Sequence, residues 1–110
     1  MAPLFLDPGV FNRRVALEAP VVVPDGAGGG ETQWQEVREL SVRIEPLAVA
    51  SRERFDQREA TVTHRVLMRA NDHVARGMAL RVGGRRLAIL SVHDPDESGR
   101  YLVCRCEEER

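Results

Sequence analysis

The sequence predicts an all-β protein, built as a small antiparallel β-barrel of about six to seven strands. Apolar and polar residues alternate along much of the 110-residue chain, as they do in strands that bury one face. Glycine, proline, asparagine and aspartate residues gather between these segments, where they favour turns. Short strands separated in this way are typical of a small barrel or a sandwich, and we predict the barrel. One long loop or short helix is expected between its third and fourth strands.

A cluster of four glycines joins the first two predicted strands, residues 13–23 and 31–37. The cluster lies in the sequence PDGAGGGETQW. A phosphate-binding loop would lead into a helix and carry a lysine at a fixed spacing, and a dinucleotide-binding loop would belong to a βαβ unit. This cluster leads into a strand instead, and the chain contains no lysine. We therefore predict a hairpin turn whose glycines permit positive φ angles.

The third predicted strand, LSVRIEPL, has the clearest alternation in the chain, with Leu40, Val42 and Ile44 on one face. The pattern changes in residues 48–60, AVASRERFDQREA, whose apolar content is only Val49, Phe55 and alanines. We expect a short helix or mobile loop here, outside the barrel and anchored by Phe55. Segments of this kind often carry partner contacts.

The strand pattern resumes in residues 60–70, where Val62, His64, Val66 and Met68 share one face. Residues 77–92 predict two strands around a Gly-Gly turn. A final strand, GRYLVCRCEEE, follows the turn sequence PDESG. Residues 13–108 are thus predicted to form a single barrel domain, and residues 1–12 an extended N-terminal arm that packs on another surface.

Composition limits the classes of function. The chain is 43% hydrophobic and 30% charged, which is typical of a soluble globular domain. Its formal net charge of −1 gives no overall attraction to nucleic acid. All 16 basic residues are arginines, which suits bidentate contacts at interfaces and is equally explained by a GC-rich genome. No segment is long and apolar enough to span a bilayer, so we expect no membrane partner.

No catalytic, cofactor or metal site is predicted, and we expect the protein not to be an enzyme. Cys104 and Cys106 share one face of a strand and are expected to be buried free thiols. The histidines, His64, His73 and His93, lack the spacing of metal ligands. No serine lies in a nucleophile-elbow context, and the aspartates of the last turn are expected to cap backbone groups.

Single-stranded nucleic-acid binding is the alternative function. It would require aromatic and basic side chains interleaved on exposed strands. Aromatic residues make up only 5% of the chain, and Trp34, Phe55 and Tyr101 lie far apart in it. Passive lining of a DNA channel requires only a local positive field, for which the candidates are Arg52, Arg54, Arg58 and Arg65.

The order of these features resembles the head–tail joining proteins of tailed bacteriophages, also called head-closure, stopper or head–tail adaptor proteins, including those of phage-like gene transfer particles. The similarity covers roughly residues 12–108. It rests on an NRRV opening strand, PDGAGGGETQWQEV, LSVRIEPL, the charged SRERFDQREATVTHRVLMR and GMALRVGGRRLAILSVHDPDESGRYLVCRCEE, in this order.

The resemblance implies a structural subunit of the head–tail connector, in a virion or gene transfer particle and synthesised in a bacterial cytoplasm. Such subunits form a ring, six being favoured here over twelve, that closes the DNA exit channel and joins the filled head to the tail. Implied partners are the portal–adaptor ring, the tail terminator or tail-tube protein, and packaged double-stranded DNA without sequence specificity. Plug candidates are Arg52, Arg54, Phe55 and Arg58; candidates for contacts with other subunits or rings are Asp25, Trp34 and Arg65.

Overall fold

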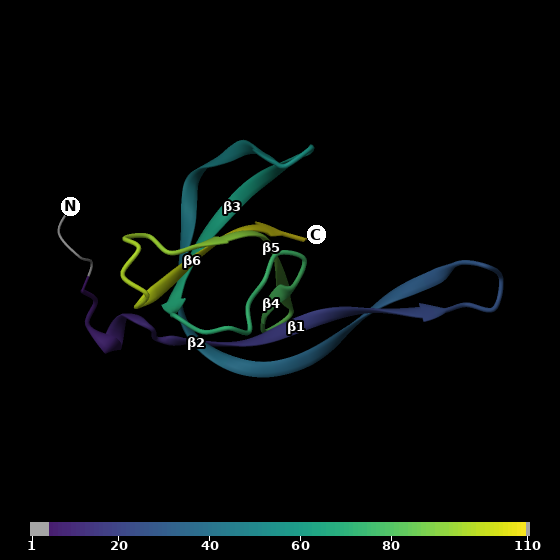
Figure 1. Ribbon diagram of the computed structural model, residues 1–110, viewed down its shortest axis with the longest axis horizontal. Helices are drawn as coiled ribbons and strands as arrows, with labels where there is room; N and C mark the ends of the chain where they lie inside the picture. The colour runs from purple at the N-terminus through teal and green to yellow at the C-terminus, as the bar shows by residue number, and fades with distance from the viewer. Residues whose placement is uncertain (1–4, 110) are drawn as a thin grey trace.

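The computed structural model describes residues 5–109, which form one closed antiparallel barrel (Figure 1). Neighbouring strands follow the order β1-β2-β3-β6-β5-β4, and β4 pairs with β1 to close the sheet. The elements are the 3₁₀ turn η1 (Pro8–Val10) and the strands β1 (Arg13–Pro24), β2 (Gly30–Phe55), β3 (Arg58–Arg69), β4 (Ala79–Val82), β5 (Arg85–His93) and β6 (Tyr101–Glu108). The all-β prediction is confirmed.

The inward faces of the strands form the core, as their alternating sequences predict. In β3, Val62, His64, Val66 and Met68 are buried, as the pattern of this segment indicates. The main core cluster draws on all six strands and contains Val15, Leu17, Val42, Val66, Met68, Leu80, Val82, Leu87, Ile89, Cys104 and Cys106. Closing the sheet lets these side chains pack on one another without any covering helix.

The two predicted short turns are also present. Gly83 adopts a φ of 60° between β4 and β5, a conformation that glycine adopts without steric cost. Between β5 and β6, the carboxylate of Asp94 accepts hydrogen bonds from the backbone N–H groups of Asp96 at 3.1 Å and Gly99 at 2.7 Å. The aspartate therefore holds the turn, as expected for this residue type.

Two predictions about β2 are wrong. The predicted second and third strands are a single strand of 26 residues. The predicted helix or mobile loop at residues 48–60 is instead the end of β2, a turn at Asp56 and Gln57, and the start of β3. From Ser51 to Phe55 the side chains alternate between half-buried and exposed positions. Because polar residues occupy most of both faces, apolar periodicity does not reveal this strand.

The N-terminal arm lies on the outer face of β3 and β6. Its predicted range of residues 1–12 includes four that fall outside the described part of the chain. The described part contains η1 and packs Phe11 against Leu67, Tyr101 and Val103. The N–H of Leu6 donates a hydrogen bond to the Tyr101 hydroxyl at 2.9 Å. The arm thus covers apolar side chains that point away from the barrel interior.

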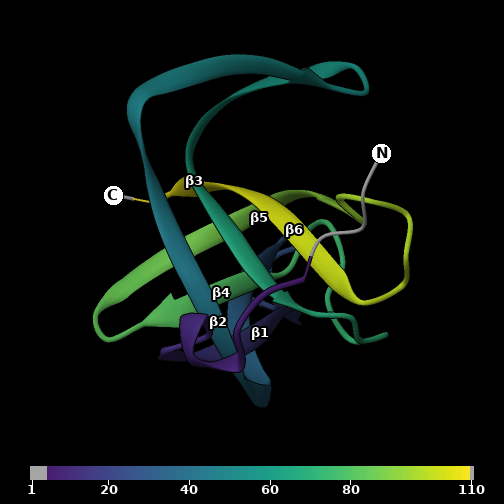
Figure 2. The same ribbon diagram turned by 90° about the vertical axis from the view of Figure 1, so that its left-hand side faces the viewer.

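The barrel is elongated, with principal extents of 55 × 28 × 24 Å, because two hairpins extend beyond the closed sheet (Figures 1 and 2). Within residues 5–109, no helix has the length and apolar character needed to cross a membrane.

Candidate assembly surfaces

The first extension, which we call the distal hairpin, comprises residues 19–37 of β1 and β2. β1 pairs with β4 only over Ala16, Leu17 and Glu18, and β2 pairs with β3 from Val42 onward. Between these points the ribbon is two-stranded, with no third strand from the described residues on either edge. Two-stranded ribbons are marginally stable alone, so this hairpin requires support from its base or from a partner.

The tip of the distal hairpin is the glycine turn that the sequence predicts. Gly26 and Gly28 adopt φ angles of 79° and 84°. Asp25 accepts hydrogen bonds from the N–H groups of Ala27 at 2.8 Å and Gly29 at 3.2 Å. Its carboxylate therefore shapes the turn, while the residue remains at the exposed end of the hairpin.

A buried glutamate holds the base of the distal hairpin. Glu18 is only 5% exposed, and its two carboxylate oxygens accept hydrogen bonds from Nε of Arg81 and Nε of Arg86, each at 3.1 Å. Arg81 also donates to Glu36 at 3.2 Å, and the Arg86 guanidinium lies 5.0 Å from the centre of the Trp34 ring. These contacts connect β1 and β2 of the hairpin to β4 and β5 of the barrel.

The register of β1 and β2 changes at the same place. Leu17 lies opposite Arg38 and Glu18 lies opposite Glu36, so Val37 is an extra residue in β2. A bulge of this kind bends a strand and increases its twist. The bulge gives the distal hairpin its direction as it leaves the barrel, and the Glu18 contacts hold it there. Trp34, a sequence-predicted contact residue, is half-buried under Arg86 at this base.

Replacing Glu18 should therefore destabilise the protein. In Glu18→Gln, two partly buried arginines lose charge-assisted hydrogen bonds, and we expect the free energy of unfolding to fall by about 2 kcal/mol. The matched control is Glu39→Gln, whose ion pair with Arg14 is well exposed and should contribute at most about 0.5 kcal/mol. Urea unfolding measures both; equal effects would contradict a special role for Glu18.

The second extension, which we call the folded-back hairpin, comprises residues 47–62 of β2 and β3. Pro46 pairs with His64 and Ser51 with Val62, so four residues of β2 lie opposite one residue of β3. This bulge of four residues bends the hairpin across the barrel beside β5 and β6 (Figure 2). Phe55 packs with a small cluster that includes Leu90 of β5, which confirms its predicted role as an anchor.

Polar contacts also attach the folded-back hairpin to β6. Arg105 donates a hydrogen bond to Glu53, and this contact holds the pKa of the Glu53 carboxyl below its usual value. The N–H of Thr61 donates to the Glu107 carboxylate at 3.1 Å. Polar side chains thus face the barrel from this hairpin, and no local pattern in the sequence indicates these pairings.

The structure separates the sequence-predicted contact residues into three places. The exposed side chains of Arg52, Arg54 and Arg58 gather on the folded-back hairpin, where Arg52 forms a 3.6 Å ion pair with Glu59. Asp25 and Trp34 lie on the distal hairpin, at its tip and base. Arg65 belongs to neither group: it lies on β3 and forms a 3.5 Å ion pair with Glu45 of β2.

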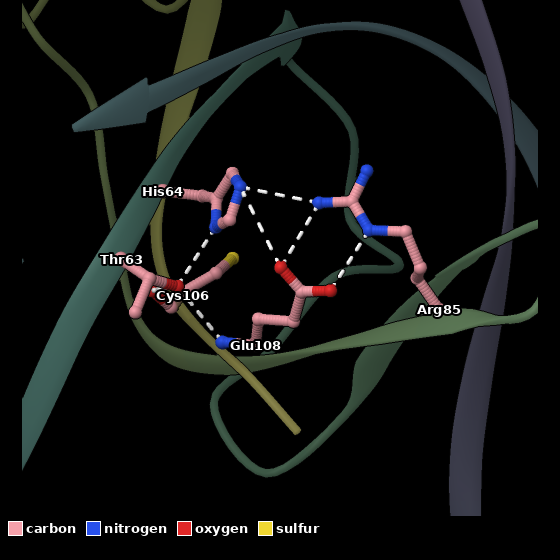
Figure 3. Close-up of polar contacts among 5 residues, drawn as sticks. All are labelled: Thr63, His64, Arg85, Cys106 and Glu108. Atoms are coloured by element: carbon pink, nitrogen blue, oxygen red, sulfur yellow. Dashed lines mark hydrogen bonds and ion pairs between the residues drawn. The ribbon is translucent and has the colours of Figure 1, made fainter. Parts of the chain in front are cut away.

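A polar cluster lies where β3, β5 and β6 meet and runs from the buried ring of His64 to the exposed guanidinium of Arg85 (Figure 3). The Thr63 hydroxyl lies 2.7 Å from Nδ1 of His64 and accepts a hydrogen bond from the N–H of Glu108 at 2.8 Å. Arg85 donates two hydrogen bonds to the Glu108 carboxylate, at 2.8 and 3.0 Å, and its Nη2 lies 3.3 Å from Nε2 of His64. The cluster joins three strands that are distant in sequence.

Burial controls the chemistry of this cluster and of the nearby thiols. It lowers the pKa of His64, an effect that the Glu108 carboxylate opposes and the Arg85 charge reinforces. Burial also raises the pKa of Cys104 to about 12 and raises the pKa of Cys106 further. Both thiols are therefore protonated at neutral pH, a state in which cysteine is a poor nucleophile and metal ligand.

The lowered pKa of His64 predicts a loss of stability in acid. An unfolded histidine binds a proton near pH 6.5, whereas buried His64 resists protonation until the pH is lower. The stabilising contribution is therefore complete above about pH 6.5 and declines as the pH falls. Urea unfolding between pH 7.5 and 5 should show a smaller decline in His64→Gln than in the wild type. His93→Gln, at an exposed position, is the control and should leave the decline unchanged.

The three aromatic residues considered in the sequence, Trp34, Phe55 and Tyr101, do not form a common stacking surface. Trp34 lies at the base of the distal hairpin, Phe55 packs beside Leu90, and Tyr101 lies under the N-terminal arm, where its ring centre is 6.0 Å from that of Phe11. Single-stranded nucleic-acid binders use successive aromatic platforms along one groove. Trp34, Phe55 and Tyr101 line no common groove, which does not favour the alternative predicted from the sequence.

The family model of phage head completion proteins matches residues 6–109, and the chain belongs to this family. A chain in the solved structure of the virion of a native gene transfer agent (GTA) particle is 30% identical, with a TM-score of 0.64. The match covers 89% of this chain and 94% of that one. A search of curated proteins gave no match.

These findings confirm the resemblance to phage head–tail joining proteins and the expected location in a virion. The protein is a structural component of the head of a phage or phage-like particle.

Proposed function

We propose that this chain is a subunit of the head–tail connector, where a ring of copies closes the DNA exit channel and joins the filled head to the tail. The observation that carries the proposal is the pair of hairpins extending from the closed barrel of a head completion family member. Both hairpins are attached to the barrel by buried or half-buried ion pairs, the distal hairpin at its base and the folded-back hairpin at Glu53, near its turn. They are therefore presented to neighbouring molecules in fixed directions.

The proposed partners follow from this position in the particle. Copies of the chain form the ring, six in number, with the portal–adaptor ring on the head side and a tail terminator or tail-tube protein on the tail side. Packaged double-stranded DNA passes through the ring, and the exposed arginines of the folded-back hairpin supply a local positive field without base recognition. The similar chain in a gene transfer agent virion supports an assembly of this kind.

The proposed role is structural and not enzymatic. Polar groups of β3, β5 and β6 bind one another, and both cysteine thiols are protonated. A nucleophile would require a neighbouring base that activates it. The His64 ring is instead in contact with Thr63 and Arg85, which are themselves engaged with Glu108.

Omission of the chain tests the connector role. Cells that produce the particle without this chain should form heads that package DNA but neither retain it nor join tails. Electron microscopy and nuclease protection of the packaged DNA measure the two defects. Tailed particles that retain DNA in the absence of the chain would contradict the proposal.

Charge removal on the folded-back hairpin tests its role in sealing. The variant Arg52→Ser/Arg54→Ser removes exposed positive charge from this hairpin and retains Glu53 and Phe55, which attach it to the barrel. Particles should incorporate the variant and lose DNA, while charge removal in Arg14→Ser, on the barrel, should leave DNA retention unchanged. Full retention of DNA by particles that contain Arg52→Ser/Arg54→Ser would argue against a sealing role.

A further inference from the structure

The charge of the distal hairpin differs from that of the remaining chain. None of the 16 arginines falls within residues 19–37, whose charged residues are Asp25, Glu31 and Glu36. Glu36 is bound by Arg81 of the same chain. Asp25 and Glu31 lie at the far end, where neither forms an ion pair with any residue between 5 and 109. The end of the hairpin therefore carries uncompensated negative charge.

The same hairpin also exposes apolar side chains. Val21, Val22 and Val23 are 40%, 68% and 37% exposed, and they are consecutive in β1. Val21 and Val23 point to one face of the ribbon, which also carries Glu31, and Val22 points to the other face. The distal hairpin thus fits a partner surface that is apolar and positively charged. Its negative charge opposes contact with DNA phosphates.

The chain itself contains a surface with these properties, which we call the arginine notch. It is a hollow of about 90 Å³ between the folded-back hairpin, β5 and the segment that precedes β4. Its apolar lining comes from Phe55, Ala60, Ile89 and Leu90. The exposed side chains of Arg58 and Arg76 lie at the notch, and neither forms an ion pair within the described part of the chain.

We propose that the distal hairpin of one copy docks in the arginine notch of a second copy. This inference rests on the proposed ring, which requires two different, complementary surfaces on each subunit. Val21 and Val23, which share a face of the ribbon with Glu31, would cover the apolar lining, and Glu31 would face Arg58 and Arg76. Within one chain the end of the distal hairpin lies apart from the folded-back hairpin in both views (Figures 1 and 2). The two surfaces are therefore free to join different subunits.

Charge reversal on each side tests this contact. In Glu31→Arg, the reversed hairpin would meet two arginines, and in Arg58→Glu/Arg76→Glu the reversed notch would meet an acidic hairpin. Like charges brought together at an interface strongly disfavour association. We expect each variant to reduce incorporation of the chain into particles by about tenfold, which corresponds to about 1.4 kcal/mol. Quantitative mass spectrometry of purified particles measures incorporation.

Rescue makes the test specific for contact between copies. The triple variant Glu31→Arg/Arg58→Glu/Arg76→Glu should regain most of the lost incorporation. Co-production of the hairpin variant with the notch variant should do the same, because alternating subunits would restore opposite charges at every contact. Arg38→Glu reverses an exposed arginine of β2 outside both surfaces and should incorporate normally.

The outcomes separate this interface from the ring itself. Loss in both reversed variants without rescue in the triple variant or the mixture would overturn the proposed contact. Loss of incorporation in only one of the two reversed variants would also overturn the proposed contact, because it would assign that surface to DNA or to another protein. In either case, wild-type chains incorporated in several copies per particle would leave the proposed ring intact. Incorporation of a single wild-type copy per particle would instead contradict the ring.

Discussion

The pairing of β1 with β4 is the contact on which the rest of the structure depends. Only three residue pairs, Ala16 with Arg81, Leu17 with Leu80 and Glu18 with Ala79, close the sheet into a barrel. Closure removes the free strand edges that would otherwise invite pairing with other chains. It also encloses a core built from all six strands without a helix. Glu18 ends this short seam and binds arginines of β4 and β5.

Because β1 and β4 pair over only three residues, strands extend past the closed sheet as hairpins. β1 and β2 continue well beyond the last residue of β1 that pairs with β4, and β2 and β3 continue beyond the four-residue bulge. Strand that is not needed for the barrel thus becomes two ribbons. Bulges set the directions of these ribbons, and ion pairs attach them to the barrel. A barrel that presents two directed ribbons is suited to the connector role proposed for this chain.

Much of this architecture is readable from sequence because local rules determine it. The alternation in β3 places Val62, Val66 and Met68 in the core, and the glycines and aspartates predict the turns. The family resemblance adds the place in a virion, which the family match confirms. Local rules also distinguish the glycine cluster from a phosphate site, because no helix and no lysine follow it.

Contacts between distant residues could not be predicted in this way. Glu18 binds Arg81 and Arg86, 63 and 68 residues later in the chain, and the only local signal is a glutamate within an apolar strand. The strand at Ser51–Phe55 lacks an apolar alternation because its barrel-facing side carries Glu53, whose charge is satisfied by Arg105 of β6. A polar residue that is buried against a distant partner has the same local pattern as an exposed one.

We infer that the two hairpins, together with the barrel residues that line the arginine notch, make the contacts of the assembled protein. Hydrogen exchange of backbone amides in the free chain and in intact particles tests it directly. In the free chain, residues 19–37 should exchange faster than the barrel core, because a two-stranded ribbon exposes its edges to water. In particles, protection should increase mainly in residues 19–37 and 47–62. Unchanged exchange in both hairpins, with new protection confined to the barrel, would contradict the account.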